Sequence, residues 1–400
     1  MTIDLRTRID PIDGPDPQRG SRIDLATIAD QLGALGTPPP VVGTLEPLDL
    51  LVEGLGAWRV SWDGRRFALA PATRPDAATT WTIAGDDLAD LLDDQVTPIG
   101  LMTSGRLHVT GRMSQAMDWW LTLRAALDHH GWSDPAAVAA DLPDLTRSFT
   151  LDDDPREVID FLDRAGFVHL RGVWSPEEMA TISADMDRAA PTYSQGDGRS
   201  WWAKTSTGDR LVRMQGFDRH SAATAELLHD DRLRHVGDAV GLGHVHEGLE
   251  GNLIEALFKP IGVIEGISDI PWHKDCSLGR HSYECCSLTC GISVTGAGPG
   301  TGQLRVIAGS HRVLVWPALM DVDRIGLPDV ALATEVGDLT VHLSCTLHMA
   351  EPPTLAERRV LYTSFRLPAL DDAAARAASR RLLSVARESA PLTTSQPSAV

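Results

Sequence analysis

The chain has 400 residues, a formal net charge of -19 and 43% apolar residues. This length favours two globular domains. The negative charge argues against nucleic acid and anionic membranes, which bind clustered lysine and arginine. No apolar stretch approaches the ~18 residues of a membrane span. The N-terminus has no signal-like apolar run, so we expect a cytoplasmic protein.

The first part of the chain predicts a small α+β domain over residues 21–132, after a flexible leader over 1–20. Its expected elements are a helix over 22–36, a hairpin over 57–72 that turns at Asp63-Gly64, a strand over 79–85, a helix over 86–92, a strand over 106–112 and a helix over 114–131. The polar, proline-punctuated segment 133–152 predicts a linker.

A second domain is predicted over residues 153–370. It begins with a helix over 155–165 and a strand over 167–173, and Ser175-Pro176-Glu177-Glu178 has the order of a helix start with a capping box. Short strands with glycine and proline turns favour a barrel or jelly roll. These strands are expected over 253–260, 287–296, 302–311, 337–344 and 358–368. A helix and tail are expected over 371–400.

Two histidine-x-aspartate pairs occur, at His229 and at His273. His229 lies in a polar, helical stretch, which favours a solvated helix end. His273 precedes Asp275 in a turn between strands, where a barrel could present both side chains to one point. A mononuclear iron site needs two imidazoles and one carboxylate with open positions beside them. The candidates for the second imidazole are His281, His311, His342 and His348. Of these, His342 lies within a strand and His311 in a turn, while His348 ends a strand before a proline-bearing loop, which is a good place for a ligand.

Residues 259–365 resemble the phytanoyl-CoA dioxygenase family of iron(II)/2-oxoglutarate oxygenases. The pieces that carry the resemblance are, in order, FKP, PWHKD, GQLRVIAGSH, GDLTVH, TLH and ERRVLYTSF. The resemblance implies a double-stranded β-helix (a jelly roll, cupin-like) with flanking helices. It also implies His273, Asp275 and His348 as the iron ligands, with Fe(II), 2-oxoglutarate and O2 as cofactor and cosubstrates.

The resemblance further implies an arginine that binds the C5 carboxylate of 2-oxoglutarate. Strand alternation does not choose between Arg358 and Arg359, because both faces of the following strand are largely apolar. The family spacing of eleven residues after His348 selects Arg359.

The chain departs from the family pattern in two places. Met349-Ala350 and the residues after them replace a serine and an asparagine that relatives often carry, so a side-chain contact to the cosubstrate is either missing or supplied by another residue. The candidates are Thr289, Lys259 and Ser287. Gly291 stands where relatives often have tryptophan, which either opens the pocket or marks a bulge in the strand.

Because the carboxylate of Asp275 is present, the resemblance favours hydroxylation or a related C–H oxidation over halogenation. A bulky, largely apolar small molecule of secondary metabolism is the expected substrate. Residues 193–210 are expected to form a loop that either closes on substrate through Trp201 and Trp202 or is plain surface.

The N-terminal domain is similar to the sterol-carrier-protein-2 family, through DDLADLLDDQVTPIGLMTSGRLHVTGRMSQAMDWW. That fold implies an apolar tunnel, and an ordinary core is the alternative. The residues expected to line the tunnel are Met102, Leu107, Val109, Met113, Met117, Trp119 and Trp120.

Two other functions remain open. The first is a non-catalytic lipid-binding protein with a degenerate barrel. The second is another metal-dependent cupin-type enzyme that uses the His-x-His pair of GHVHEG.

The odd count of five cysteines, all late in the chain, predicts no disulfide framework. The sequence does not determine the substrate or the oligomeric state.

Overall fold

The computed structural model describes residues 23–39, 41–92, 98–103, 105–127, 134–239, 245–246, 253–266, 268, 271–275, 287–315 and 322–366. The expected leader, the expected C-terminal helix and His281 lie outside these residues. Within them, no helix is long and apolar enough to cross a membrane. The two cysteines inside them, Cys290 and Cys345, form no disulfide with each other.

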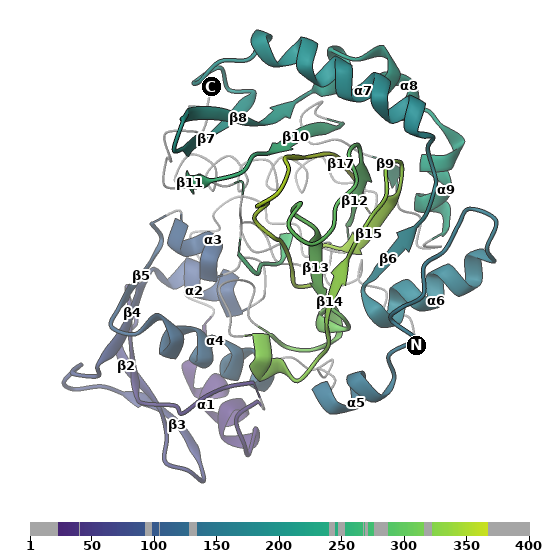
Figure 1. Cartoon of the computed structure of the whole chain (residues 1–400). Helices are drawn as coiled ribbons and strands as arrows, with labels where there is room; N and C mark the ends of the chain where they lie inside the picture. The colour runs from purple at the N-terminus through teal and green to yellow at the C-terminus, as the bar shows by residue number, and fades with distance from the viewer. Residues whose placement is uncertain are drawn as a thin grey trace.

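The N-terminal domain is a five-stranded sheet covered by helices (Figure 1). Its helices are α1 (Leu25–Ala34), α2 (Gly85–Leu92), α3 (Pro98–Thr103) and α4 (Met113–Leu127), and its strands are β1 (Leu48–Val52), β2 (Gly56–Trp62), β3 (Phe67–Pro71), β4 (Thr79–Ile83) and β5 (Leu107–Thr110). The strand order is β3-β2-β1-β4-β5, with β1 parallel to β4. We did not expect β1 because its sequence, LDLLV, does not alternate. A central strand that is buried on both faces has no need to alternate.

The second domain contains a large and a small sheet. The large sheet has the order β11-β7-β8-β10-β17-β12-β15-β6, with β9 paired to β17, and the small sheet has the order β14-β13-β16. The strands of the large sheet are β6 (Phe167–Leu170), β7 (Ser200–Thr205), β8 (Gly208–Gln215), β9 (Val245–His246), β10 (Glu255–Lys259), β11 (Val263–Glu265), β12 (Leu288–Ser293), β15 (Leu339–Leu343) and β17 (Arg358–Arg366). Those of the small sheet are β13 (Leu304–Ile307), β14 (Asp329–Leu332) and β16 (His348–Ala350). The expected short strands are therefore present, in two antiparallel sheets, and the double-stranded β-helix stays a prediction.

Helices follow the outer side of the large sheet (Figure 1). They are α6 (Pro155–Ala165), α7 (Pro176–Ala189), α8 (Ala222–Leu227) and α9 (Asp231–Ala239), with short 3-10 turns η3 (Ala190–Thr192), η4 (Phe217–Arg219), η7 (Ser310–Arg312) and η8 (Val322–Ile325). The predicted start of α7 is confirmed, because Ser175 and Glu178 form a reciprocal capping box. Gly166 ends α6 in the left-handed conformation, with φ 83°.

The N-terminal domain shares one hydrophobic core with the small sheet. Four of the expected tunnel residues are buried in that core, namely Leu107, Met117, Trp119 and Trp120, while Met113 is exposed. From the second domain the same core takes Ile307, Val313, Leu314, Val315, Ile325, Leu327 and Leu347. The resemblance to the sterol-carrier-protein-2 family stays a prediction. The shared core joins this domain to the small sheet.

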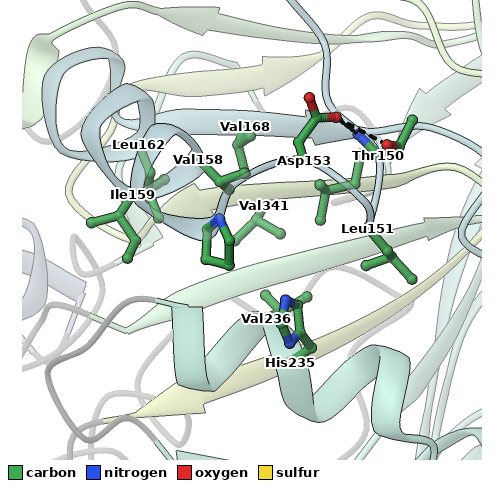
Figure 2. Close-up of a pocket in the computed structure, with 12 residues that line it drawn as sticks. Thr150, Leu151, Asp153, Val158, Ile159, Leu162, Val168, His235, Val236 and Val341 are labelled. Carbon is green, nitrogen blue, oxygen red and sulfur yellow. Dashed lines mark hydrogen bonds between the residues drawn. The ribbon is translucent and has the colours of Figure 1, made fainter.

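The segment expected to be a linker contains a helix and buried apolar residues within residues 134–152. Helix α5 (Pro135–Ala140) lies within it, and its Val138 packs into the shared core. Phe149 is fully buried in the core of the second domain and bridges to Leu170 beside β6. Asp153 accepts hydrogen bonds from Thr150 over a small apolar cavity (Figure 2). Polar residues marked this segment as exposed, but its few apolar residues anchor it to both domains.

The expected loop over 193–210 is also corrected, because most of it is a β-hairpin. Strands β7 and β8 pair antiparallel, with a register shift between Trp201 and Trp202. Gly208, with φ 120°, begins β8. Half of the glycines and serines that suggested a loop, namely Ser194, Gly196 and Gly198, lie before β7.

Candidate metal centre

Two histidines are brought side by side by a short antiparallel bridge. His273 donates its backbone N–H to the carbonyl of His348 at 3.0 Å, and His348 returns a bond at 2.9 Å. Paired residues on antiparallel chains project to the same side. The two imidazole centroids are consequently 4.3 Å apart.

Both imidazoles are oriented through their Nδ1 atoms. His273 Nδ1 lies 2.7 Å from the carbonyl of Pro271, and His348 Nδ1 lies 2.9 Å from the carbonyl of Thr346. A carbonyl only accepts, so each Nδ1 carries a proton, and in the neutral ring each Nε2 offers a lone pair to a metal. Burial and the neighbouring His348 lower the pKa of His273 to about 4, which keeps its ring neutral.

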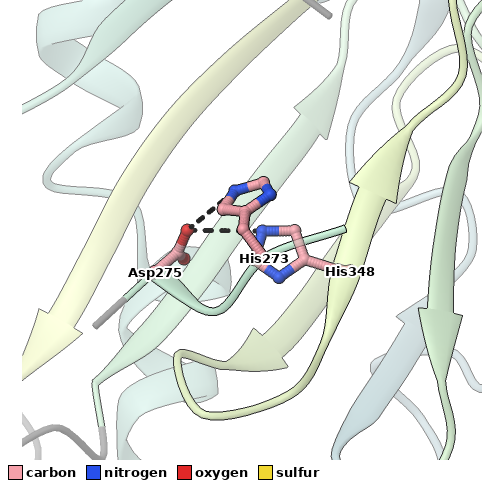
Figure 3. A group of neighbouring side chains, drawn as sticks. All are labelled: His273, Asp275 and His348. Atoms are coloured by element: carbon pink, nitrogen blue, oxygen red, sulfur yellow. Dashed lines mark ion pairs between the residues drawn. The ribbon is translucent and has the colours of Figure 1, made fainter. Parts of the chain in front are cut away.

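The carboxylate of Asp275 faces both free nitrogens (Figure 3). Its Oδ1 lies 3.7 Å from His273 Nε2 and 3.3 Å from His348 Nε2. One ligand atom from each residue lies within 4.8 Å of the others, and among the described residues this is the one such group. The donor set of two imidazoles and one carboxylate fits a divalent transition metal with open positions.

The charges of this group depend on one another. Loss of water contact raises the pKa of Asp275, but His348 and His342 bring that pKa well below its ordinary value. Burial disfavours the charged form of His348, yet the Asp275 carboxylate raises the pKa of His348 overall. The group is therefore held together electrostatically, with the carboxylate ionised.

The site lies between the two sheets. His348 begins β16 of the small sheet, while Asp275 also contacts the large sheet through Thr289 and His342. The Thr289 hydroxyl donates to Asp275 Oδ2 at 2.6 Å, and Thr289 is directly opposite His342 in the β12–β15 pair. We call the side of the large sheet that carries Thr289 and His342 the inner face. The cavity in Figure 2 is lined by Val341, the neighbour of His342, and so lies on the outer face, away from the metal site.

Arg359, the arginine that the family spacing selects, lies on the face of the large sheet opposite the inner face. Its guanidinium donates to Ser183 Oγ at 3.0 Å and pairs with Asp187 at 2.8 Å, both on α7. The preceding residue, Arg358, has the opposite orientation and is 2% exposed. Strand β17 registers Ser364 opposite Thr289, so Arg358, six residues earlier, shares the inner face with Thr289.

Two buried cations stand next to each other on the inner face. Arg358 is directly opposite Lys259 in the β10–β17 pair, and Lys259 is 5% exposed. Arg358 Nη1 donates to the carbonyl of Gly302 at 2.8 Å, while its Nε has no hydrogen-bond partner among the described residues. Lys259 Nζ donates to the carbonyl of Ser268 at 2.6 Å. Buried cations of this kind suit a carboxylate ligand.

Gly291 provides space for an aromatic ring that the sequence reasoning missed. A Cβ atom built on Gly291 would lie 2.9 Å from Thr340 Oγ1 and 3.1 Å from the ring of Tyr362. Tyr362 is opposite Gly291 in the β12–β17 pair and shares the inner face. Its ring occupies the place beside Gly291.

The two tryptophans of β7 have different surroundings. Trp201 is opposite Arg213, whose guanidinium lies 4.3 Å from the centre of the indole ring. Arg213 is also opposite Leu257, and Leu257 is opposite Val360. Val360 lies on the same face of β17 as Arg358, so Trp201 lies on the inner face. Trp202 donates its indole N–H to Ser200. Ser200 is the neighbour of Trp201 in β7 and therefore points to the outer face, so the indole N–H of Trp202 lies on that face.

The structure sorts the remaining histidines. His229 is exposed after α8, as expected for a solvated helix end. His311 binds the carbonyl of Asp163 at 2.9 Å and stays outside the metal-binding group. Of the GHVHEG motif, the structure describes Val245 and His246, and His246 contacts Thr363. Sequence reasoning considered His342 and Arg358 but chose neither. The strand register was the signal that places both on the inner face.

Residues 162–360 match the family model described as phytanoyl-CoA dioxygenase (PhyH), so this part of the chain is a domain of that family. The matched residues include His273, Asp275, His348 and Arg358. It begins after the N-terminal domain.

A curated relative, the ectoine dioxygenase of Nocardia farcinica, is 30% identical over 167 residues, which cover 40% of this chain and 52% of the relative. The chain thus aligns with about half the length of that relative. Among solved structures, EctD from S. alaskensis with 2-oxoglutarate and 5-hydroxyectoine is 20% identical, with a TM-score of 0.44 over 56% of this chain and 81% of that chain. AviO1 from Streptomyces viridochromogenes Tue57 is 22% identical, with a TM-score of 0.43 over 55% of this chain and 97% of that chain.

Proposed function

We propose that the chain is a non-heme iron(II)- and 2-oxoglutarate-dependent oxygenase that oxidises a C–H bond of a small molecule, and that it acts in the cytoplasm. The observation that carries the proposal is the convergence of His273 Nε2, His348 Nε2 and Asp275 Oδ1 within 4.8 Å of one another. The family match over residues 162–360 supports the same reaction class. The named ectoine dioxygenase relative also supports it.

The proposed iron ligands are His273, Asp275 and His348. Iron(II) bound there would supply the activation of O2, with 2-oxoglutarate as the electron donor that leaves as succinate and CO2. The protein's part is to orient both Nε2 atoms toward the metal and to keep the carboxylate ionised. The bonds from the two Nδ1 atoms to backbone carbonyls support the first task, and the lowered pKa of Asp275 supports the second.

We assign the C5 carboxylate of 2-oxoglutarate to Arg358, with Lys259 beside it. Both side chains are buried on the face of the sheet that carries Thr289. A guanidinium offers two parallel N–H donors to a carboxylate, and a buried site makes such charge-assisted bonds strong. Thr289, which we expected to contact the cosubstrate, instead holds the metal-binding carboxylate.

The proposed substrate is a bulky, largely apolar small molecule of secondary metabolism, oxidised by hydroxylation or a related reaction. Trp201 and Tyr362 support this choice, because both place aromatic surface on the inner face. A panel that contains both ectoine and lipophilic metabolites would test it.

The test of the proposed function combines two measurements on the full chain. Purified protein should take up iron(II) in a ratio near one per chain, and it should release succinate from 2-oxoglutarate under O2. A lipid-binding protein with a degenerate barrel would show neither result. A zinc or manganese enzyme of the cupin type would retain its metal without succinate release.

A further inference from the structure

A fourth histidine lies against the metal-binding group without a conventional partner. His342, at the centre of β15, is 1% exposed, and neither of its ring nitrogens forms a hydrogen bond within the described part of the chain. A buried polar group left in this state destabilises a fold, so its retention here calls for a reason. Its ring centre lies 4.1 Å from that of His348, so its environment is the metal site itself.

The two oxygens of Asp275 have different neighbours. Oδ1 is the oxygen nearest to His273 and His348, as described above. Oδ2 accepts a hydrogen bond from Thr289 and lies 3.4 Å from His342 Nε2. Thr289 and His342 come from adjacent strands and are directly opposite each other, so they approach the same oxygen together.

We infer that His342 is a positioning residue for Asp275, which together with Thr289 holds Oδ2 and leaves Oδ1 to the metal. This inference rests on the proposed function. Neutral His342 has one N–H, and donation from Nε2 to Oδ2 needs only a small approach from 3.4 Å. A carboxylate with both oxygens free can bind a metal through two atoms. With Oδ2 held, it binds through one and leaves a coordination position open for cosubstrate.

The position of His342 argues against its being a ligand itself. The three ligand atoms of His273, Asp275 and His348 form a compact group that excludes His342. His342 also lies on the side of Oδ2, whereas the two ligand imidazoles lie on the side of Oδ1.

The test measures Co(II) binding to the full-length protein by titration, together with the visible absorption of the bound Co(II). His342→Phe keeps a ring but removes both nitrogens, and Thr289→Val removes the hydroxyl at nearly constant volume. Each change should weaken Co(II) binding by about 10–100-fold, the usual effect of losing a group that orients a ligand. Each should also change the absorption, because the carboxylate is then free to bind through both oxygens. His342→Gln places an amide N–H near the original Nε2 and should restore most of the affinity.

A variant that lacks the Asp275 carboxylate distinguishes a positioning role of His342 from direct coordination of the metal by His342. In Asp275→Ala protein, His342→Phe should produce no further loss of Co(II) affinity, because its effect passes through the carboxylate. A further loss there would mean that His342 binds the metal, and would overturn the inference. His246→Phe, a change to a histidine on the edge strand β9, is the matched control and should leave Co(II) binding unaltered.

The remaining outcomes also decide the matter. Unaltered Co(II) affinity in His342→Phe, with or without a lower melting temperature, would reduce His342 to a packing residue and overturn the inference alone. Failure of the unmodified protein to bind Co(II) would overturn the proposed function and this inference with it.

Discussion

Arg358 and Arg359 leave strand β17 on opposite faces of the large sheet. Arg358 is buried beside Lys259 on the inner face, and Arg359 pairs with Asp187 of α7 on the outer face. Successive side chains in a strand alternate, so a shift of one residue exchanges a buried inner-face arginine for one that pairs with α7. The ten-residue spacing from His348 to Arg358 is one shorter than the family spacing that selected Arg359.

Substitution of the two arginines should separate these roles. Arg358→Ala should raise the apparent KM for 2-oxoglutarate about 10–100-fold, because a charge-assisted pair in a buried site is lost. Arg359→Ala should lower the melting temperature by loosening α7, while KM stays near normal. Steady-state succinate release and thermal unfolding measure the two effects. A large KM effect confined to Arg359→Ala would restore the assignment by spacing.

Removal of either ligand histidine should abolish metal binding. His273→Ala or His348→Ala should weaken Co(II) or Fe(II) binding by more than about 100-fold, beyond the loss typical of groups that only orient ligands. His229→Ala is the control, because His229 is exposed and lies outside the group. Metal titration followed by elemental analysis checks both results. Loss of metal in His229→Ala alone would show that the wrong histidine-x-aspartate pair was chosen.

Substitution of Trp201 and of Trp202 should have different effects on the KM for the organic substrate, once the panel has identified one. Trp201→Ala should raise the KM for that substrate but leave the KM for 2-oxoglutarate in place, since Trp201 is on the inner face at the far end from Thr289. Trp202→Ala should change neither constant, because its indole N–H binds Ser200 on the other side. Equal effects of both substitutions would contradict the separation of faces.

The N-terminal domain should be needed for a stable metal site. Leu347 precedes the ligand His348, and Leu347 is fully buried in the core shared with α4. A chain that begins at residue 134 exposes this apolar surface and should aggregate or lose Co(II) binding. Leu121→Ala within α4 gives a milder test and should lower stability by about 2–5 kcal/mol. A soluble shortened protein with unaltered Co(II) affinity and kinetics would remove the supporting role.

Acid should destabilise the protein in part through His311. Burial lowers the pKa of His311 to about 4, below the ~6.5 of an unfolded histidine. Between these values the unfolded chain binds the extra proton, so stability is complete above pH ~6.5 and falls as the pH drops toward 4. His311→Gln should show a shallower fall of the unfolding free energy over this range, measured by denaturant titration. An unaltered pH dependence would mean that His311 is not neutral in the folded state.

Residues close together in the sequence were sufficient to predict much of this protein. The capping box of α7 and the Asp63-Gly64 hairpin depend on local contacts, so local patterns were enough. The iron-binding hypothesis for His273, Asp275 and His348 came from family motifs, whose order along the chain is itself sequence information.

Tertiary structure decided what depends on strand register and on packing between distant segments. The inner-face positions of Arg358 and His342 follow from pairings with strands distant in sequence. Side chains alternate along a strand, but the alternation alone does not say which of the two faces is the inner one. The segment expected to be a linker was assigned by its polar composition, yet Val138 and Phe149 anchor it to two cores. The joining of the two domains into one core beneath Leu347 was likewise beyond the sequence, because burial depends on partners that a local pattern does not name.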